Sequence, residues 1–330
     1  MYNPIDSRLR KINYKPQKLK ILTVPTHEGY QTLLGETGHE FYMLQGQGIK
    51  QWDFHTRLLP KNHYLITRPF DQVYPPGLQF DLLLSQERYG GLQRFLDMGQ
   101  KLQVPVLHID HTMPPPGQNQ HTIDELSKMR ANAHIFITEF NKQAWSGHPE
   151  DIVIPHGIDT ATFSGATCLN PAGVSVVNHF QQRDVFCGWT LWQQIAAKVP
   201  IKLLGENPGI SQSINNPSVL SATLGGFRFF LNTSQWSPVP LSMLEAMAVG
   251  IPIVTTAKQE IPKIIQHGHN GFLFDTAEEA VGYCMQLISD KDLALRMGAN
   301  ARKTIEAQFN INKFVSSWNR IITKTYEDYR

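Results

Sequence analysis

The sequence predicts two α/β domains, each built on a parallel β-sheet. The chain has 330 residues, of which 41% are hydrophobic and 18% are charged, so it is long enough and apolar enough for two globular cores. Short apolar runs of strand type alternate with helical patterns through both halves of the chain. That alternation is typical of parallel βαβ units.

In the first half, each expected strand is a short apolar run with a turn residue or a proline at its end. The run at 20–24 ends at Pro25 and precedes a loop that contains Gly29 and a short helix. The further strands are expected at 38–44, 64–67, 81–85, 104–109, 134–138 and 152–155. A helix is expected at 91–102, where apolar residues recur at positions 92, 95, 96 and 102.

The second half repeats this pattern after a stretch rich in Ala, Thr, Gly and Pro at 161–173, where we place the linker. Strands are expected at 174–177, 201–204, 227–231, 251–255 and 271–274. Helices are expected at 277–290, 291–308 and 313–329. We therefore divide the chain into domains at 1–165 and 166–310 and a last helix at 311–330, whose apolar face could pack back on the first domain.

Charge is almost balanced over the whole chain but not along it. The chain has 30 Lys and Arg and 28 Asp and Glu, which gives a formal charge of +2. The large overall positive charge that is typical of a nucleic-acid-binding protein is therefore missing. Residues 1–20 differ, because they hold six basic side chains and one acid: Arg8, Arg10, Lys11, Lys15, Lys18, Lys20 and Asp6. This leader is either a solvated lead-in to the first strand or a contact for phosphates of an anionic lipid surface or of nucleic acid.

Cysteine content and hydropathy indicate the compartment. Cys168, Cys187 and Cys284 are too few and too scattered for a disulfide framework or a structural zinc site, and are expected to be reduced, buried thiols. The sequence has no apolar stretch of the length that a membrane span needs and no apolar core of a secretory signal. We expect a cytoplasmic protein.

The segment 231–256 carries the most chemical information. It has the pattern of a strand, a loop, a helix stopped by Gly250, and a second strand. A helix that starts directly after a sheet strand can bind an anion, because its unpaired N–H groups and its dipole face the ligand. Glu245, three residues after Ser242, is either the glutamate of a capping box or an acceptor for the ribose hydroxyls of a nucleotide.

Several segments together resemble glycosyltransferase family four over about residues 20–310. The segment PLSMLEAMAVGIPIVT at 240–255 is similar to the C-terminal signature of that family. VIPHGID at 153–159, followed by Phe163, resembles the family's junction between domains. IPKII at 261–265, GHNGFL at 268–273 and GHE at 38–40 agree in order and spacing.

The resemblance implies the GT-B fold, with two Rossmann-like domains that face each other across a cleft. It implies retaining, metal-independent transfer of a sugar from a nucleotide-diphosphate sugar, which is a co-substrate and leaves the enzyme without a cofactor. The N-terminal domain would take the acceptor and the C-terminal domain the donor. The acceptor is expected to be a saccharide or a lipid-linked glycan, or, given the basic leader, a hydroxymethylated DNA base.

The expected site residues follow from the resemblance and from strand ends. His111, at the end of the strand that precedes a proline-rich loop, and Glu245 are expected to be the catalytic residues, with His111 in contact with sugar and acceptor. His27 and Glu28 are expected on the acceptor side. The residues expected to bind the donor are Gly29, Arg183, Ser237, Val239, Leu241, Ser242 and Glu245.

The sequence also departs from the family pattern where the donor would bind. Ser237 stands where the family usually has a glutamate, and Pro240 stands where it usually has a glycine, which removes one backbone donor. The family's basic pair is replaced by Asn178 and His179, so Arg183 is the permanent charge expected near that position. These departures bear on the identity of the donor and on diphosphate binding.

Other interpretations remain open at this point. A GT-B protein can also epimerise or hydrolyse a sugar nucleotide, or bind one without catalysis. A metallohydrolase would need ligands among His108, Asp110, His111 and His121. The D-x-D pattern at 290–292 is expected to be a helix cap, and Trp52, Tyr74 and Trp145 to be core residues or stacking platforms for a sugar or base.

Overall fold

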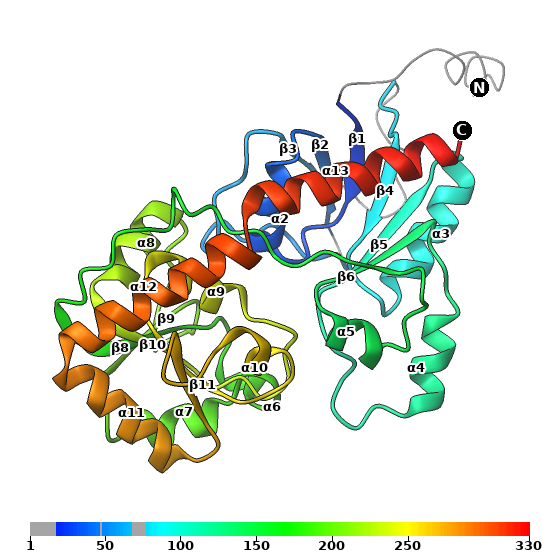
Figure 1. Cartoon of the computed structure of the whole chain (residues 1–330). Coiled ribbons are helices and arrows are strands. Elements are labelled where there is room, and N and C mark those ends of the chain that lie inside the picture. Colours follow the sequence, from blue (N-terminus) through cyan, green and yellow to red (C-terminus); the bar gives the residue numbers. More distant parts are fainter. Residues whose placement is uncertain (1–17, 47, 68–76) are drawn as a thin grey trace.

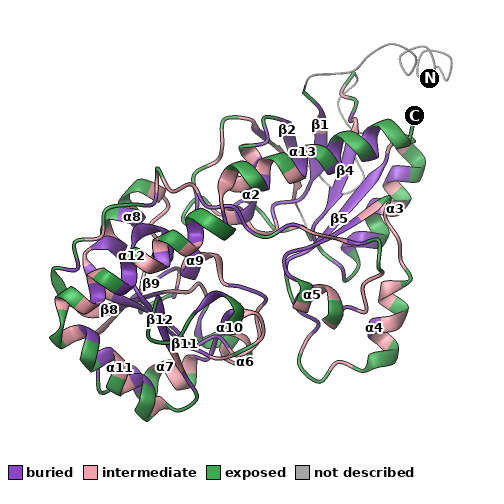
Figure 2. Cartoon of the chain, viewed as in Figure 1, coloured by how far each residue is buried: buried purple, intermediate pink, exposed green. Residues whose placement is uncertain are grey.

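The computed structural model describes residues 18–46, 48–67 and 77–330 (Figure 1). It contains two α/β domains, one on a seven-stranded sheet and one on a five-stranded sheet. The strands of both sheets are largely buried, and the exposed residues lie mainly on the helices and loops around them (Figure 2). The prediction of two domains with parallel sheets is confirmed.

The N-terminal sheet has the doubly wound order β3-β2-β1-β4-β5-β6-β7, with every neighbouring pair parallel. Its strands are β1 (Lys20–Thr23), β2 (Glu40–Gln45), β3 (His63–Thr67), β4 (Leu82–Ser85), β5 (Val106–Asp110), β6 (Ala133–Phe136) and β7 (Ile152–Val153). Its helices are α2 (Glu28–Gly35), α3 (Gly91–Leu102), α4 (Gln120–Ser127) and α5 (Glu139–Ala144). The strand order reverses between β1 and β4, which places a ligand crevice at their carboxyl ends.

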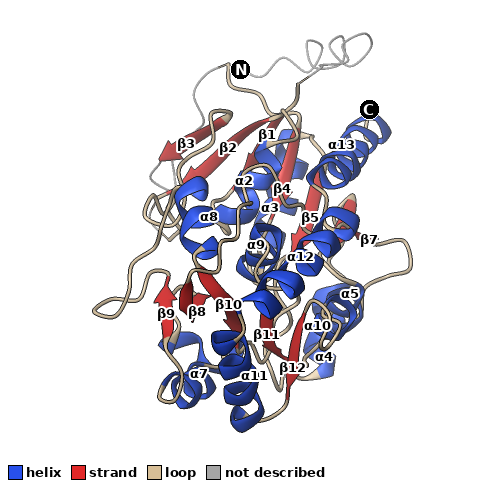
Figure 3. Cartoon of the chain, turned by 60° about the vertical axis from the view of Figure 1, so that its left-hand side comes forward, coloured by secondary structure: helices blue, strands red, loops and turns tan. Residues whose placement is uncertain are grey.

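The C-terminal sheet has the order β12-β11-β10-β8-β9 and is also parallel. Its strands are β8 (Asn170–Val176), β9 (Ile201–Leu204), β10 (Phe227–Asn232), β11 (Ile253–Thr256) and β12 (Gly271–Phe274). Its helical elements are η1 (Gln181–Arg183), α6 (Asp184–Cys187), α7 (Trp189–Ala196), α8 (Pro217–Gly225), α9 (Leu241–Val249), α10 (Ile261–Ile264), α11 (Ala277–Ser289) and α12 (Lys291–Gln308). Helices lie on both sides of these strands (Figure 3), and the order reverses between β8 and β10.

The last helix, α13 (Ile311–Asp328), leaves the C-terminal domain and runs along the N-terminal domain beside α2 (Figure 1). Its residues Phe314, Trp318 and Ile322 are buried in the core of that domain. The indole Nε1 of Trp318 donates a hydrogen bond of 3.0 Å to the hydroxyl of Tyr30 on α2. A contiguous apolar face at 3–4 spacing is therefore what α13 uses to dock.

The chain passes between the domains at two places that lie side by side. On the way out, Ile158 donates its backbone N–H to Phe309 O at 2.7 Å. On the way back, Asn310 forms an isolated parallel bridge with Ile158, and a Cβ on Gly157 would meet the ring of Phe314. The two crossings are thus hydrogen-bonded to each other.

The expected linker is more structured than its composition suggests. β8 begins at Asn170, inside the expected linker 161–173, because the backbone N–H of Asn170 bonds to Gly226 O at the start of the sheet. Phe163 and Cys168 are buried in the C-terminal core. Small residues and a proline suggested a loop, whereas pairing with β10 makes the last four residues of this stretch, 170–173, part of a strand.

Several smaller expectations are confirmed. The three cysteines are free and buried. Asp290 is the N-cap of α12, where its carboxylate accepts from Leu293 N at 2.8 Å. Trp52 and Trp145 are core residues, each 4% exposed or less. Within the described ranges, no helix combines the length and the apolar character needed to cross a bilayer.

Candidate active site

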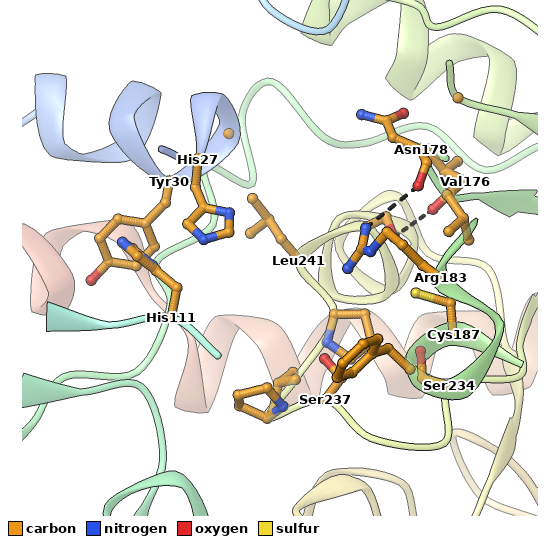
Figure 4. A pocket seen from close by; sticks show the side chains of 18 of the residues that line it. His27, Tyr30, His111, Val176, Asn178, Arg183, Cys187, Ser234, Ser237 and Leu241 are labelled. Carbon is orange, nitrogen blue, oxygen red and sulfur yellow. Dashed lines mark hydrogen bonds between the residues drawn. The ribbon is translucent and has the colours of Figure 1, made fainter. Parts of the chain in front are cut away.

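A cavity of about 530 Å³ lies between the two domains. It is lined by the loops that follow β1 and β5 in one domain and β8 and β10 in the other, so it joins the two reversal points of the sheets. All of the residues expected from the sequence line it: His27, Glu28, Gly29, His111, Arg183, Ser237, Val239, Leu241, Ser242 and Glu245. Figure 4 shows that His27, Tyr30 and His111 face Leu241, Ser237 and Arg183 across this space.

The start of α9 forms the floor on the C-terminal side. Pro240 is the N-cap and accepts no side-chain cap bond, and Gly250 ends the helix in the left-handed conformation at φ 98°. The first N–H groups of a helix have no partner within it. Together with the helix dipole, they make this end of the cavity suitable for an anion.

Of the two interpretations given for Glu245, the capping box at the start of α9 is wrong. The helix begins at Leu241, so Ser242 lies inside the first turn and its hydroxyl donates to Val176 O at 3.0 Å. Pro240 holds the N-cap position with a backbone at φ −66°. The carboxylate of Glu245 is consequently free of the helix start and points to another partner.

That partner is Arg57, in the loop between β2 and β3 of the N-terminal domain. Arg57 Nη2 donates to Glu245 Oε1, and the two residues are 8% and 5% exposed. Burial raises the pKa of Glu245, and the positive charge of Arg57 opposes that rise. The ion pair joins the two domains at the centre of the cavity.

Arg183 lies on the rim of the cavity. Its Nη1 donates to Asn178 O at 3.4 Å (Figure 4), and Arg183 as a whole is exposed. Gly29 marks a close approach of the domains, because a Cβ there would lie 2.9 Å from Leu241 Cδ2. On the other side, Trp236 Nε1 donates to Pro114 O at 2.6 Å and connects the loops after β10 and β5.

On the N-terminal side, Glu28 stabilises a neighbouring loop. Its carboxylate accepts from Lys50 Nζ at 2.8 Å and from the backbone N–H of Asp53 at 3.3 Å. His27 is the N-cap of α2 and lies against His111, with ring centroids 4.4 Å apart. Burial, with the charges of Lys50 and Arg183 nearby, lowers the pKa of His27 to about 3. His27 is therefore a neutral ring at the edge of the cavity.

His111 follows β5 directly and is buried. Its Nε2 lies 2.9 Å from Gln86 Oε1, and its ring meets the edge of Tyr30 at a centroid distance of 4.5 Å. Burial lowers the pKa of His111 well below its ordinary value, and the neighbouring His27 and His156 add to that shift. The ring is neutral at pH 7.

The cavity also contains residues that sequence reasoning did not single out as site residues: Tyr30, Arg57, His156 and Trp236. Asn178, which stands in place of the family's basic pair, lines it too. His156 lies within the VIPHGID junction, so its position in a recognised motif was the available signal. Burial lowers its pKa to about 4. Arg57 is in a loop without a motif, and its partner Glu245 lies 188 residues away in the sequence, so no local pattern could have identified the pair.

A separate group of His108, Asp110 and His134 has the ligand types of a metal site. Asp110 is already paired with Arg88, whose Nε donates to Oδ1 at 3.0 Å. His134 Nε2 accepts from Ala131 N at 2.8 Å, which leaves the proton on Nδ1 and removes it as a ligand. His121 is exposed on α4, away from the group. These residues fit a structural polar cluster better than a metal centre.

Two expectations concern residues outside the described ranges. Tyr74 and the leader from Asp6 to Lys15, which includes Arg8, Arg10 and Lys11, belong to segments that the structure does not describe. The expectations about stacking by Tyr74 and about phosphate contacts by the leader stay predictions.

Comparison with known proteins finds a match to a family model within the C-terminal domain. Residues 185–304 match the family model described as Glycosyl transferases group 1. Over 90 residues the chain is 36% identical to N-acetyl-alpha-D-glucosaminyl L-malate synthase of Bacillus anthracis, which covers 27% of this chain and 24% of that protein. Over 108 residues it is 30% identical to spore coat protein SA of Bacillus subtilis, which covers 31% and 27%. The aligned stretches thus span about a quarter of each of these two relatives.

Similarity of structure extends over almost the whole chain. The fold matches Anabaena HepE in complex with UDP and glucose at a TM-score of 0.75 and 13% identity, covering 92% of this chain and 99% of that one. It matches sucrose-phosphate synthase from Thermosynechococcus elongatus at 0.73 and 15% identity, covering 94% and 100%. The architecture is the GT-B fold that the sequence predicted.

Proposed function

We propose that this chain, a GT-B protein whose residues 185–304 form a glycosyl transferases group 1 domain, moves a sugar from a nucleotide-diphosphate sugar to an acceptor hydroxyl. The observation that carries the proposal is the grouping of an anion site and a buried carboxylate in one cavity between the domains. The start of α9 and Arg183 suit the diphosphate, and Glu245 suits the ribose hydroxyls. A cavity of about 530 Å³ is in the range of small-molecule sites.

In this reaction the bond from the anomeric carbon to the diphosphate breaks, a bond to the acceptor oxygen forms, and the proton of the acceptor hydroxyl passes to the leaving diphosphate. The leaving diphosphate gains negative charge, which fixed cations and backbone N–H groups can stabilise. We assign this stabilisation to Arg183 and the first turn of α9, and the contact with sugar and acceptor to His111, because all of them line the cavity. We propose that transfer is retaining and needs no metal ion, and we assign no protein nucleophile.

The acceptor would enter from the side of His27 and Glu28, on the N-terminal domain. We propose a saccharide or a lipid-linked glycan, with a hydroxymethylated DNA base as the alternative that the basic leader favours. These acceptors differ in how binding responds to salt, because only DNA offers a long row of phosphates. Charge reversal at Arg8, Arg10 and Lys11 would flatten the salt dependence of DNA binding if DNA is the acceptor.

The test is a panel of nucleotide sugars with and without acceptors, scored for nucleotide release and for the sugar product. Transfer to an acceptor supports the proposal. Release to water, conversion of the free sugar nucleotide or binding without turnover would instead indicate a hydrolase, an epimerase or a binding protein. Addition of EDTA should leave the rate unchanged.

The matched variants are Glu245→Ala in the cavity and Glu278→Ala, an exposed glutamate on α11. Loss of the ribose contact should weaken nucleotide binding about tenfold or more in Glu245→Ala. Glu278→Ala should bind as the unaltered chain does. The proposal fails if no nucleotide shifts the melting temperature and Glu245→Ala changes nothing.

A further inference from the structure

A continuous line of hydrogen-bonded side chains, buried except for the half-buried Asn62, connects the edge of the N-terminal sheet with His111. At its far end, Asn62 Nδ2 donates to the backbone carbonyls of Gly35 and His39 at 2.9 and 2.7 Å. Both hydrogens of that amide are therefore used, and Asn62 Oδ1 can only accept. It lies 3.1 Å from His63 Nδ1, which must carry the proton.

The direction of hydrogen-bond donation fixed at Asn62 determines the direction at the next residues. His63 is neutral, since burial lowers its pKa to about 4, so its Nε2 is a bare acceptor. Gln31 Nε2 lies 2.8 Å from this nitrogen and must donate to it. Gln31 Oε1 then faces Gln86 Nε2, which donates at 2.7 Å. Each amide in the line has one allowed orientation.

Gln86 is held by a second, independent set of bonds. Its Nε2 also donates to Thr23 Oγ1 at 2.8 Å and lies 3.3 Å from Val24 O. The hydroxyl of Thr23 donates to Leu84 O at 2.8 Å, so Thr23 Oγ1 can only accept from Gln86. With its amide nitrogen fixed from two sides, Gln86 must present its oxygen to His111 Nε2 at 2.9 Å.

We propose that this line of hydrogen bonds locks His111 in the neutral tautomer with the proton on Nε2, so that Nδ1 accepts a hydrogen bond from a hydroxyl of the bound sugar or acceptor. Gln86, Gln31, His63 and Asn62 are positioning residues, because they act on the reaction through His111. The identity of the ligand in this inference rests on the proposed function. The tautomer of His111 rests on the hydrogen bonds alone.

The surroundings of His111 support this assignment. Among the described residues, the structure gives Nδ1 no hydrogen-bond partner, while His111 lines the cavity. Gln31 and Gln86 are 0% and 3% exposed, so water does not compete for their amides. A buried amide turned the wrong way would leave its polar atoms unpaired and away from water, which is unfavourable.

Nuclear magnetic resonance of the full chain labelled with ¹⁵N-histidine tests the tautomer without any substrate. Long-range ¹H–¹⁵N spectra report which imidazole nitrogen carries the proton, and His111→Gln and His63→Gln assign the two rings. At pH 7 we expect opposite tautomers, with the proton on Nε2 of His111 and on Nδ1 of His63. A proton on Nδ1 of His111, or a ring that interconverts between both forms, overturns the inference.

A pair of glutamine variants tests the consequence for the reaction. Gln86→Met should let His111 exchange between tautomers and lower kcat about 3- to 10-fold, which is the range for one hydrogen bond. Its affinity for UDP should stay unchanged. Gln100→Met, an exposed glutamine on α3, should alter neither the spectra nor the rate. If Gln86→Met does not fold, Asn62→Leu should release the tautomer of His63, because the acceptor for the proton on Nδ1 is lost.

The outcomes separate this inference from the proposed function. A single Nε2-protonated His111 in Gln86→Met, or an unchanged kcat beside a mixed tautomer, overturns the positioning role even when transfer is observed. A locked tautomer in a chain that transfers no sugar to any acceptor counts against the proposed function alone.

Discussion

Arg57 of the N-terminal domain is ion-paired with Glu245 of the C-terminal domain inside the cavity that separates them. Arg57 bonds to Oε1, and the structure gives no partner to Oε2 among the described residues. One carboxylate can thus be held by arginine and still accept a ribose hydroxyl. The arginine also opposes the rise in the pKa of Glu245 that burial causes.

The first prediction concerns the pH dependence of nucleotide binding. Burial raises the pKa of Glu245 and Arg57 lowers it, so Arg57→Met should raise that pKa further. A protonated carboxyl is a poorer acceptor, and affinity should therefore fall as pH falls through this pKa. We expect the loss to begin at a higher pH in Arg57→Met. Calorimetric titration with UDP between pH 5 and pH 9 measures the affinity of both proteins. Ionisation of the diphosphate itself affects both proteins equally, so it does not contribute to the difference between them.

An exposed arginine provides the control for that experiment. Arg296→Met on α12 changes the same side chain outside the cavity and should leave the pH profile unchanged. Identical profiles for Arg57→Met and the unaltered chain would show that Arg57 does not control the ionisation of Glu245.

Removing Arg57 alone should lower the melting temperature more than removing both charges of the Arg57–Glu245 pair. Arg57→Met leaves a buried carboxylate without its cation, whereas Arg57→Met combined with Glu245→Gln removes both charges. We expect the single variant to melt at a lower temperature than the double variant, because an unpaired buried charge costs more than a neutral pair. Differential scanning calorimetry measures this, and a double variant that melts below the single one would contradict it.

Arg183 should contribute to the affinity for the diphosphate and not to the affinity for the nucleoside. Arg183→Gln removes a permanent charge from the rim of the cavity, so it should weaken binding of UDP about tenfold. Binding of uridine should change little, because uridine carries no phosphate. Competition between the two ligands by thermal shift measures the difference, with Arg296→Gln as the control. An equal loss for both ligands would place Arg183 elsewhere in the site.

The losses of stability caused by changing Trp318 and Tyr30 should not be additive. Trp318→Phe keeps most of the buried ring but removes the donor to Tyr30, at a cost of about 1 kcal/mol. In a chain of this size the melting temperature should fall by about 2 °C. Tyr30→Phe added to Trp318→Phe should cost less than the sum of the two single changes, because both remove the same bond. Additive losses in a double-mutant cycle would argue against the bond.

Two glycines should respond in opposite ways to alanine. Gly282 is within α11, and a Cβ there would meet no atom within 4 Å, so Gly282→Ala should stabilise by about 0.5–1 kcal/mol. Gly250 ends α9 at φ 98°, where an L side chain is strained, so Gly250→Ala should destabilise by about 1 kcal/mol. Thermal melts of the two variants should therefore move in opposite directions, and any other result would contradict the helix boundaries.

Regular amphipathic patterns were predictable because the information is local. α3 at 91–102 and α12 at 291–308 begin and end where the sequence predicts. The same holds for β12 at 271–274, where a glycine and three apolar residues follow a turn. In these segments the pattern that forms the element is also the pattern that buries it.

Side-chain partners were harder to predict, because they are distant in sequence. Ser242 and Glu245 have the spacing of a capping box, yet Val176 O and Arg57 take their polar groups. Thr276 and Glu279 have the same spacing, and there a true capping box forms at the exposed start of α11. The difference lies in the surroundings: one helix start is solvated, and the other is enclosed by a second domain.

The return of α13 also bears on the order in which the protein can form during synthesis. The core of the N-terminal domain includes Phe314, Trp318 and Ile322, which are synthesised after the whole of the C-terminal domain. Domains usually fold as they emerge, with the N-terminal one first. Here the domain whose strands are made first cannot be completed until the C-terminal domain has also been synthesised, and until then the apolar surface around Tyr30 and Leu34 remains open to chaperones.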